Sequence, residues 1–102
     1  MSHKLYVTCW RHMALDSFNR LIAAPMAPSI AEMWVEIEAT SKQSDAFPEY
    51  TTFISIKPTT DCAIAIGVDP EADPEYHFVE AGEFRFYGVE KGHKIAVVEV
   101  LL

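Results

Sequence analysis

Five short apolar segments in the second half of the chain decide the fold: 50–57 (YTTFISIK), 62–68 (CAIAIGV), 76–80 (YHFVE), 83–89 (EFRFYGV) and 95–102 (IAVVEVLL). Each has five to eight residues and is rich in the β-branched and aromatic side chains that strands prefer. Turn-forming sequences separate them, namely Pro-Thr-Thr-Asp, Asp-Pro, Ala-Gly and Lys-Gly, and all 4 glycines lie in this half. The pattern predicts an all-β fold of short antiparallel strands.

Residues 33–39 (MWVEIEA) extend this pattern toward the N-terminus. Apolar side chains at the odd positions alternate with Trp34, Glu36 and Glu38, which is typical of a strand with one buried face. The body of the protein is therefore predicted to span residues 30–102. Its six strands, with a seventh from the N-terminal segment, predict a small antiparallel β-sandwich of 6–7 strands.

Residues 1–29 are predicted to form an arm that precedes the body. Residues 4–10 (KLYVTCW) have the composition of a strand. Apolar residues at helical spacing follow and predict one short helix, which begins near Asp16 and ends near Ala24 because Pro25 stops it. The apolar side chains of the arm need a covering surface, either the body of the same chain or a neighbouring subunit.

Length and composition indicate one folded domain. The chain has 102 residues, 50% of them apolar, which is enough for a hydrophobic core. Its net charge of −7 argues against nucleic-acid binding, which needs clustered lysines and arginines. The opening MSHKLYVTCW lacks the apolar region of a signal peptide, and no apolar stretch is long enough to cross a membrane. We therefore expect synthesis in a cytoplasm, with Cys9 and Cys62 as reduced, buried thiols.

The charge is unevenly distributed along the chain. Residues 1–30 have a net charge of +2, whereas residues 31–102 have a net charge of −9. A basic arm and an acidic body attract each other, within one chain or between copies. Arg11 and Arg20 are the arm residues expected to make such contacts.

Three patterns invite comparison with catalytic and metal-binding sites. The loop 69–75 (DPEADPE) has alternating carboxylates but lacks the glycine that turns a calcium loop. The histidines form no H-x-H or H-x-x-x-H pair for a metal. Cys62 opens the most apolar segment, where an inert buried thiol is expected rather than a nucleophile activated by His77 or His93. The sequence therefore predicts no catalytic residue, no metal site and no cofactor.

Aromatic residues are too numerous for one small core. Alternation along strands buries about half of them, so the others must face a partner, a ligand or another subunit. Core packing is expected for Phe84 and Phe86, and an interface for Trp34 and for Tyr87, which lies close to Arg85 in the sequence. The interface candidates, including those of the arm, are Leu5, Trp10, Arg11, Phe18, Arg20, Leu21, Trp34, Arg85 and Tyr87.

Residues 44–100 resemble a class of small structural proteins of phages and prophages. The resemblance is carried, in chain order, by SDAF (44–47), FISIKPTT (53–60), AIAIGVD (63–69), FVEAGEFRFYGV (78–89) and GHKIAVVEV (92–100). In such proteins the domain is a β-sandwich on the capsid surface or around the neck and tail, and terminal arms often clasp neighbours. The resemblance implies a structural role in a virion, with the N-terminal thirty residues unmatched.

These features predict a non-enzymatic virion protein, assembled in the host bacterial cytoplasm as a capsid decoration (cement) protein or a head–tail neck component. Its expected partners are copies of itself and the major capsid or connector and tail proteins, with neither nucleic acid nor membrane. Two alternatives stay open. One is a small carbohydrate- or ligand-binding sandwich that uses Trp34 and Tyr87, and the other is a cupin-like metalloprotein with His77, His93 and Glu80.

Overall fold

The computed structural model describes residues 3–15, 21–25 and 28–101, and this part of the chain contains ten β-strands and no helix. In chain order the strands are β1 (His3–Trp10), β2 (Met13–Leu15), β3 (Leu21–Pro25), β4 (Ala31–Ile37), β5 (Lys42–Gln43), β6 (Phe53–Pro58), β7 (Cys62–Gly67), β8 (Phe78–Val79), β9 (Arg85–Gly88) and β10 (Lys94–Glu99). The prediction of an all-β protein is confirmed for the described residues.

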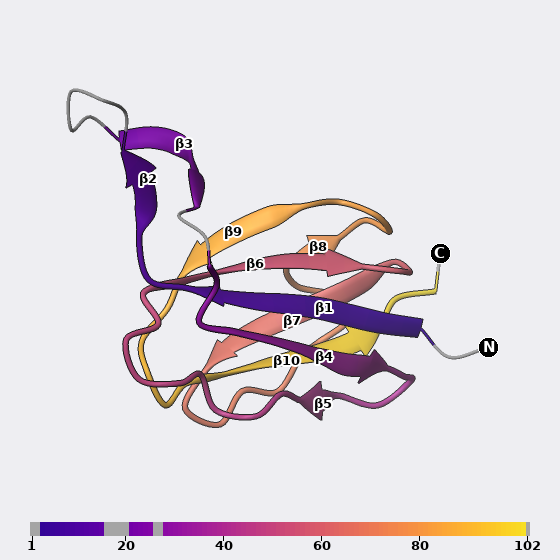
Figure 1. Ribbon diagram of the computed structural model, residues 1–102. Helices are drawn as coiled ribbons and strands as arrows, with labels where there is room; N and C mark the ends of the chain where they lie inside the picture. The colour runs from indigo at the N-terminus through magenta and orange to yellow at the C-terminus, as the bar shows by residue number, and fades with distance from the viewer. Residues whose placement is uncertain (1–2, 16–20, 26–27, 102) are drawn as a thin grey trace.

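Two antiparallel four-stranded sheets stack on each other as a sandwich (Figure 1). The front sheet has the order β4-β1-β6-β9, and the back sheet has the order β5-β10-β7-β8. The hairpin β2–β3 forms a third, two-stranded sheet that projects beyond one end of the front sheet (Figure 1). It is inserted between β1 and β4, which are neighbours in the front sheet.

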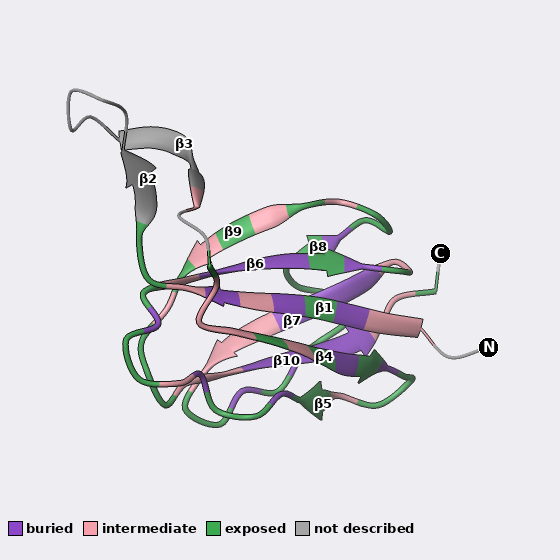
Figure 2. Cartoon of the chain, in the orientation of Figure 1, coloured by how far each residue is buried: buried purple, intermediate pink, exposed green. Residues whose placement is uncertain are grey.

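The core lies between the two sheets, where β1, β6, β7 and β10 contribute most of the buried positions (Figure 2). Alternate residues of each strand point inward, as the two-residue period of a strand requires. The largest fully buried side chains are Leu5, Ile54, Ile56, Ile95, Val7, Val79, Val97, Pro58, Cys9 and Cys62. Both sheets therefore supply the same hydrophobic cluster.

The N-terminal strand is part of the sandwich, which corrects the division into an arm over 1–29 and a body over 30–102. β1 lies between β4 and β6, with Leu5 opposite Val35 on one side and opposite Pro58 on the other. Leu5 is 0% exposed and belongs to the chain's own core, so it is not an interface residue. A strand with three inward apolar side chains buries more apolar surface in the centre of a sheet than in a separate arm, and this burial stabilises the fold.

The short N-terminal helix is not seen. Its predicted C-terminal half instead forms strand β3, in which Leu21 pairs with Leu15 of β2. A helix of this length is marginal in water, and a paired strand satisfies the same backbone groups. Phe18 and Arg20 lie outside the described residues, as does the side chain of Leu21, so their predicted contacts stay predictions.

Two turns of the second half lie at the glycines from which they were predicted. Gly82 and Gly92 have φ angles of +77° and +80°. Residues with a Cβ atom rarely adopt this region of backbone conformation, so glycine is favoured at both positions. They lie in the predicted Ala-Gly and Lys-Gly turns. The strand predicted at 76–80 is shorter, because only β8 is paired, and the short strand β5 was not predicted.

Removal of residues 1–10 is expected to abolish folding, because the front sheet then loses the strand that joins β4 to β6. The matched control replaces residues 11–29 with Asn-Gly, a two-residue turn that joins the paired ends of β1 and β4. That variant should keep its stability within about 2 kcal/mol of the wild type. Circular dichroism and urea denaturation of both proteins measure the difference, and a folded protein without β1 would contradict the assignment.

Candidate functional site

The outer face of the front sheet carries large exposed aromatic side chains. Because Leu5, Val7 and Cys9 point into the core, the intervening side chains of β1 point outward. Tyr6 of β1 lies opposite Trp34 of β4, and their exposed fractions are 48% and 52%. The two side chains therefore leave the sheet at neighbouring positions, and each keeps about half of its surface in solvent, where aromatic surface is costly to leave uncovered.

A continuous series of rings crosses the same sheet from β1 to β9. Trp10 stacks on Phe53 at 6.4 Å between ring centroids, with 13° between the ring planes. Phe53 contacts Phe86 at 6.1 Å, and Phe86 contacts Phe84 edge-on at 5.1 Å. The indole Nε1 of Trp10 donates a 2.9 Å hydrogen bond to Ser55 Oγ, which fixes its ring on the sheet. We call the resulting surface the aromatic face, which comprises Tyr6, Trp10, Trp34, Phe53, Phe84 and Phe86.

The two phenylalanines before and within β9 are exposed rather than buried. Phe84 is 58% exposed and Phe86 is 45% exposed, so the expectation that they pack in the core is wrong. Phe86 pairs with Ser55, whose position on β6 faces outward like that of Phe53. Arg85 and Tyr87 occupy the inward positions of β9 instead, opposite Ile56 and Ile54.

The charges on the aromatic face are divided by strand. β4 carries Glu32 and Glu36, whereas β1 and β6 carry Lys4 and Lys57. The Nζ atom of Lys4 lies 4.3 Å from the centroid of the Trp34 ring, a cation–π contact that holds both side chains. The face therefore has an acidic edge beside a basic middle, although the whole chain has a net charge of −7.

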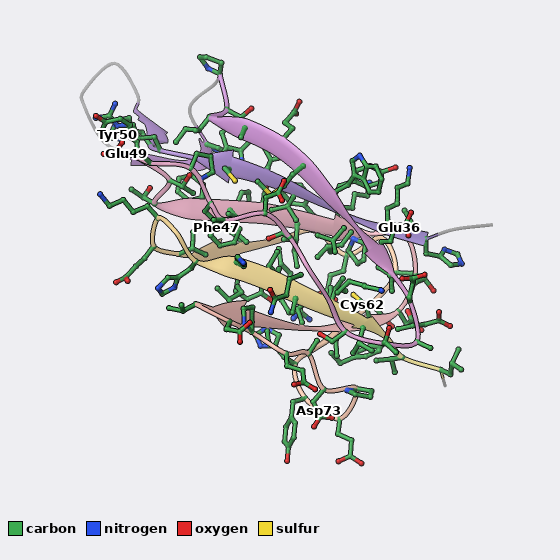
Figure 3. All side chains as sticks on the ribbon, turned by 90° about the horizontal axis from the view of Figure 1, so that it is seen from below. Glu36, Phe47, Glu49, Tyr50, Cys62 and Asp73 are labelled. Carbon is green, nitrogen blue, oxygen red and sulfur yellow. The ribbon has the colours of Figure 1, made fainter. Side chains whose placement is uncertain are left out.

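The chain leaves the front sheet for the hairpin beside Arg11. The guanidinium of Arg11 lies 4.8 Å from the ring centroid of Tyr50, and the backbone oxygen of Arg11 accepts a 2.6 Å hydrogen bond from Thr52 Oγ1. Tyr50 has a φ of +73° and lies at the end of the molecule from which the hairpin projects (Figure 3). Arg11 thus contacts the chain's own surface, next to the Trp10 end of the aromatic face.

Arg85 and Tyr87 belong to a polar cluster at the edge between β9 and β8. Arg85 donates hydrogen bonds to Glu83 and, over 3.2 Å, to the hydroxyl of Tyr87. That hydroxyl lies 2.9 Å from Nε2 of His77. The hydrogen bond from Arg85 lowers the pKa of Glu83. Tyr87 and Trp34 point to opposite sides of the front sheet, so they do not form one stacking surface.

The histidines do not assemble a cupin-like site. The backbone oxygen of His77 accepts from Ile64 in the middle of β7, whereas His93 precedes β10, whose first residue pairs with Gly67 at the far end of β7. His93 lies 3.5 Å from Glu90 instead. Across residues 3–15, 21–25 and 28–101, no group of three or more histidine, cysteine, aspartate or glutamate side chains is placed to hold a metal ion.

The acidic loop 69–75 is tied to the segment that precedes it. Gln43 Nε2 donates 2.8 Å hydrogen bonds to Asp69 Oδ1 and to the backbone oxygen of Pro70, and Ser41 Oγ accepts from the backbone of Ala72. A shallow polar hollow of about 390 Å³ lies between the two segments. Asp73 projects from the far side of the molecule, below the back sheet in Figure 3. These hydrogen bonds hold the loop, and Ala72 adds apolar packing because it is buried against Ala63, Ala96 and Val98 of the back sheet.

Both cysteines are free and buried, as predicted from the sequence. Cys62 is 0% exposed and lies inside the sandwich (Figure 3). Burial, with a smaller contribution from the charge of Asp61, raises the pKa of its thiol to about 12. Burial also raises the pKa of Cys9. A thiol in this environment stays protonated at neutral pH, which is the opposite of what a nucleophilic cysteine needs.

No protein-family model, curated protein or solved structure matches the chain. Among the described residues, no helix is long and apolar enough to span a membrane. The sequence identified Trp10 and Trp34 as interface candidates but missed Tyr6. The alternation of residues 4–10 could have indicated it, because Tyr6 points to the other face of the strand from Leu5 and Val7.

Alkaline pH is expected to destabilise the protein through Cys62. The folded thiol has a pKa of about 12, whereas that of an unfolded thiol is about 8.5, so the unfolded chain releases the proton first. Stability should fall as pH rises from about 9 to about 12. Urea denaturation across this pH range should show that the free energy of unfolding falls less steeply with pH for Cys62→Ala than for the wild type. Equal slopes for the two proteins would contradict the raised pKa.

Proposed function

We propose that the chain is a non-enzymatic structural protein of a phage virion, which acts by protein–protein assembly through the aromatic face. A capsid decoration protein or a head–tail neck component are the two positions that fit this role. The observation that carries the proposal is the aromatic face itself, whose four most exposed rings have about half of their surface in solvent. Aromatic residues are enriched at protein interfaces, where they supply most of the binding energy.

The shape of the chain supports an assembly role. The hairpin β2–β3 projects from the sandwich at the end where Trp10 lies, as an element that reaches a neighbour does (Figure 1). The pattern over residues 44–100 resembles that of small phage structural proteins and gives the proposal its virion context. A β-sandwich that exposes one sheet face and one projecting hairpin has two separate surfaces for neighbours.

A second candidate function is carbohydrate binding on the same face. Trp10 and Phe53 lie nearly parallel, with 13° between their planes, and flat exposed rings are surfaces on which sugar rings stack. Trp34 extends the platform on the other side of β1. The sequence predicted Trp34 and Tyr87 as the sugar-binding residues. Tyr87 lies on the inner side of β9, so Trp10 and Phe53 take its place in this proposed carbohydrate site.

The virion proposal predicts that particles of the phage or prophage that encodes the chain contain it in many copies. Quantitative mass spectrometry of purified particles measures this directly. Particles lacking the chain should take up the purified wild-type protein but not Trp34→Ser/Phe86→Ser, because that variant removes two exposed rings of the aromatic face. The matched control is Tyr76→Ser, an exposed aromatic in the loop before β8, which should be taken up normally. Absence of the chain from the particles would refute the proposal.

The carbohydrate alternative is tested by tryptophan fluorescence, because both tryptophans of the chain lie on the aromatic face. Titration with soluble oligosaccharides from bacterial surfaces and plant cell walls should give saturable quenching. Phe53→Ala should weaken the oligosaccharide affinity measured by that quenching by about tenfold or more, since covering one phenylalanine ring is worth about 1.5–3 kcal/mol. Tyr76→Ala serves as the control that leaves it unchanged. Quenching that never saturates would reject this function.

A further inference from the structure

We propose that the free edge of β4 binds an extended segment of a partner protein as a fifth strand of the front sheet, and that this segment carries basic side chains on either side of an apolar one. This inference rests on the proposed assembly function and names the element of the partner that docks. The argument comes from the backbone groups of β4 and from the charges beside them.

The two four-stranded sheets end in edge strands of very different length. β4 and β9 are the edges of the front sheet, and β5 and β8 are the edges of the back sheet. β4 has seven residues, whereas β9 has four, and β5 and β8 have two each. Among the residues that the structure describes, no strand pairs with the outer edge of β4 (Figure 1). This edge is therefore the one on which another strand finds the longest template.

The backbone of β1 shows which groups of β4 are left unpaired. The carbonyl oxygen of Lys4 accepts a 2.9 Å hydrogen bond from the N–H of Thr59, on the β6 side. The carbonyl oxygen of Cys9 accepts a 2.8 Å hydrogen bond from the N–H of Ile30, on the β4 side. The N–H and C=O groups of one residue in a strand point to the same side, and this side alternates from residue to residue. Even-numbered residues of β1 therefore bond to β6, and odd-numbered residues bond to β4.

Alternate residues of β4 consequently direct their backbone groups away from β1. The odd-numbered residues of β1 lie opposite the odd-numbered residues of β4, which use their N–H and C=O groups in that pairing. The backbone groups of Glu32, Trp34 and Glu36 therefore point out of the free edge, and each residue supplies one donor and one acceptor. An extended chain matches this repeat of donors and acceptors, as it does where peptides bind by adding a strand to a sheet.

The side chains of the same three residues specify the chemistry of the added segment. Glu32 and Glu36 are exposed on either side of Trp34. Within the described part of the chain neither carboxylate forms an ion pair, and the Nζ atom of Lys4 lies over the Trp34 ring. An added strand places one side chain opposite each of the three, so a basic–x–apolar–x–basic sequence pairs with both carboxylates and with the ring.

The same charges disfavour a second copy of β4 as the added strand. Antiparallel pairing of two β4 strands centred on Trp34 places Glu32 of one copy opposite Glu36 of the other, at both ends of the pair. Like charges directly opposite each other in a sheet are destabilising, and charged edge strands are a means by which proteins avoid self-pairing. The edge therefore selects against copies of itself and in favour of a basic segment.

An added strand also extends the aromatic face. It continues the front sheet beside β4, so its central apolar side chain lies next to Trp34 and covers part of a ring that is 52% exposed. One short strand buries far less than the roughly 800 Å² per partner of a standard interface. We therefore expect a dissociation constant on the order of 0.1 mM for an isolated peptide, which many linked copies in an assembly would strengthen.

NMR titration of the isotope-labelled chain with a synthetic peptide tests the proposal. The probe is acetyl-Thr-Lys-Thr-Val-Thr-Lys-Thr-amide, which should bind saturably and shift the amide signals of β4 most. Replacement of both lysines by glutamate should weaken binding by at least about tenfold. N-methylation of the valine, whose N–H faces β4, should also weaken it by at least about tenfold. N-methylation of the preceding threonine, whose N–H points away, should change the affinity by less than about threefold.

Glu36→Pro tests the edge on the chain itself. Proline lacks the N–H and is tolerated on an edge strand where that N–H faces solvent, so circular dichroism should show a folded sandwich. This variant should lose peptide binding, whereas Glu36→Ala removes the charge, keeps the N–H and should weaken binding by about three- to tenfold. Glu75→Ala, the loss of an exposed carboxylate in the loop 69–75, should bind like the wild type. If Glu36→Pro does not fold, the two N-methylated peptides decide.

The outcomes separate this inference from the proposed function. Failure of the basic peptide to bind, or equal binding of the two N-methylated peptides, overturns strand addition at β4. Equal or tighter binding of the glutamate peptide overturns the basic chemistry of the partner. A wild-type dimer in sedimentation velocity that Glu36→Pro abolishes overturns it in favour of a second copy. Uptake of the purified chain into particles, with failure of Trp34→Ser/Phe86→Ser, leaves the virion role standing in each of these cases.

Discussion

The pairing of β1 with both β4 and β6 is the interaction on which the rest of the structure depends. It places Leu5, Val7 and Cys9 in the core and directs the alternate side chains, among them Tyr6 and Trp10, to the outer face. A shift of one residue in this register would exchange the two sets and expose the core side chains. The hydrophobic core and the aromatic face are thus two consequences of one strand register.

The strands of the second half were predictable because characteristic turn residues mark their ends in the sequence. Gly82 and Gly92 need positive φ angles, and the apolar segments between the turns match β6, β7, β9 and β10 closely. The N-terminal third was not predictable in the same way. Local periodicity indicates that residues 4–10 form a strand, but it carries no information about which distant strands pair with it. The short apolar segment before Pro25 fits a helix or a strand equally well, and only its pairing with β2 decides.

The candidate site shows the same limit. Trp34 was identifiable because it interrupts an acidic strand face, and Trp10 because its strand is rich in aromatic residues. Phe84 and Phe86 alternate with Arg85 and Tyr87, and the larger apolar surface of the two phenylalanines wrongly favoured them as the inward pair. Pairing of β9 with β6 decides this, because it aligns Tyr87 with the buried Ile54. Arg85 can occupy an inward position since the edge of the sheet lets its guanidinium reach Glu83 and the Tyr87 hydroxyl.

The position of β1 also has a consequence for the order of folding during synthesis. The ribosome makes β1 before either of its neighbours, and β6 follows more than forty residues later. Until Phe53–Pro58 has emerged, one edge of β1 has no partner, and the opposite sheet that covers its apolar side chains is complete only after β10 follows. Such non-local pairing slows folding and leaves an unpaired strand exposed to other nascent chains. The N-terminal strand therefore stays unpaired on one edge while more than forty further residues are synthesised.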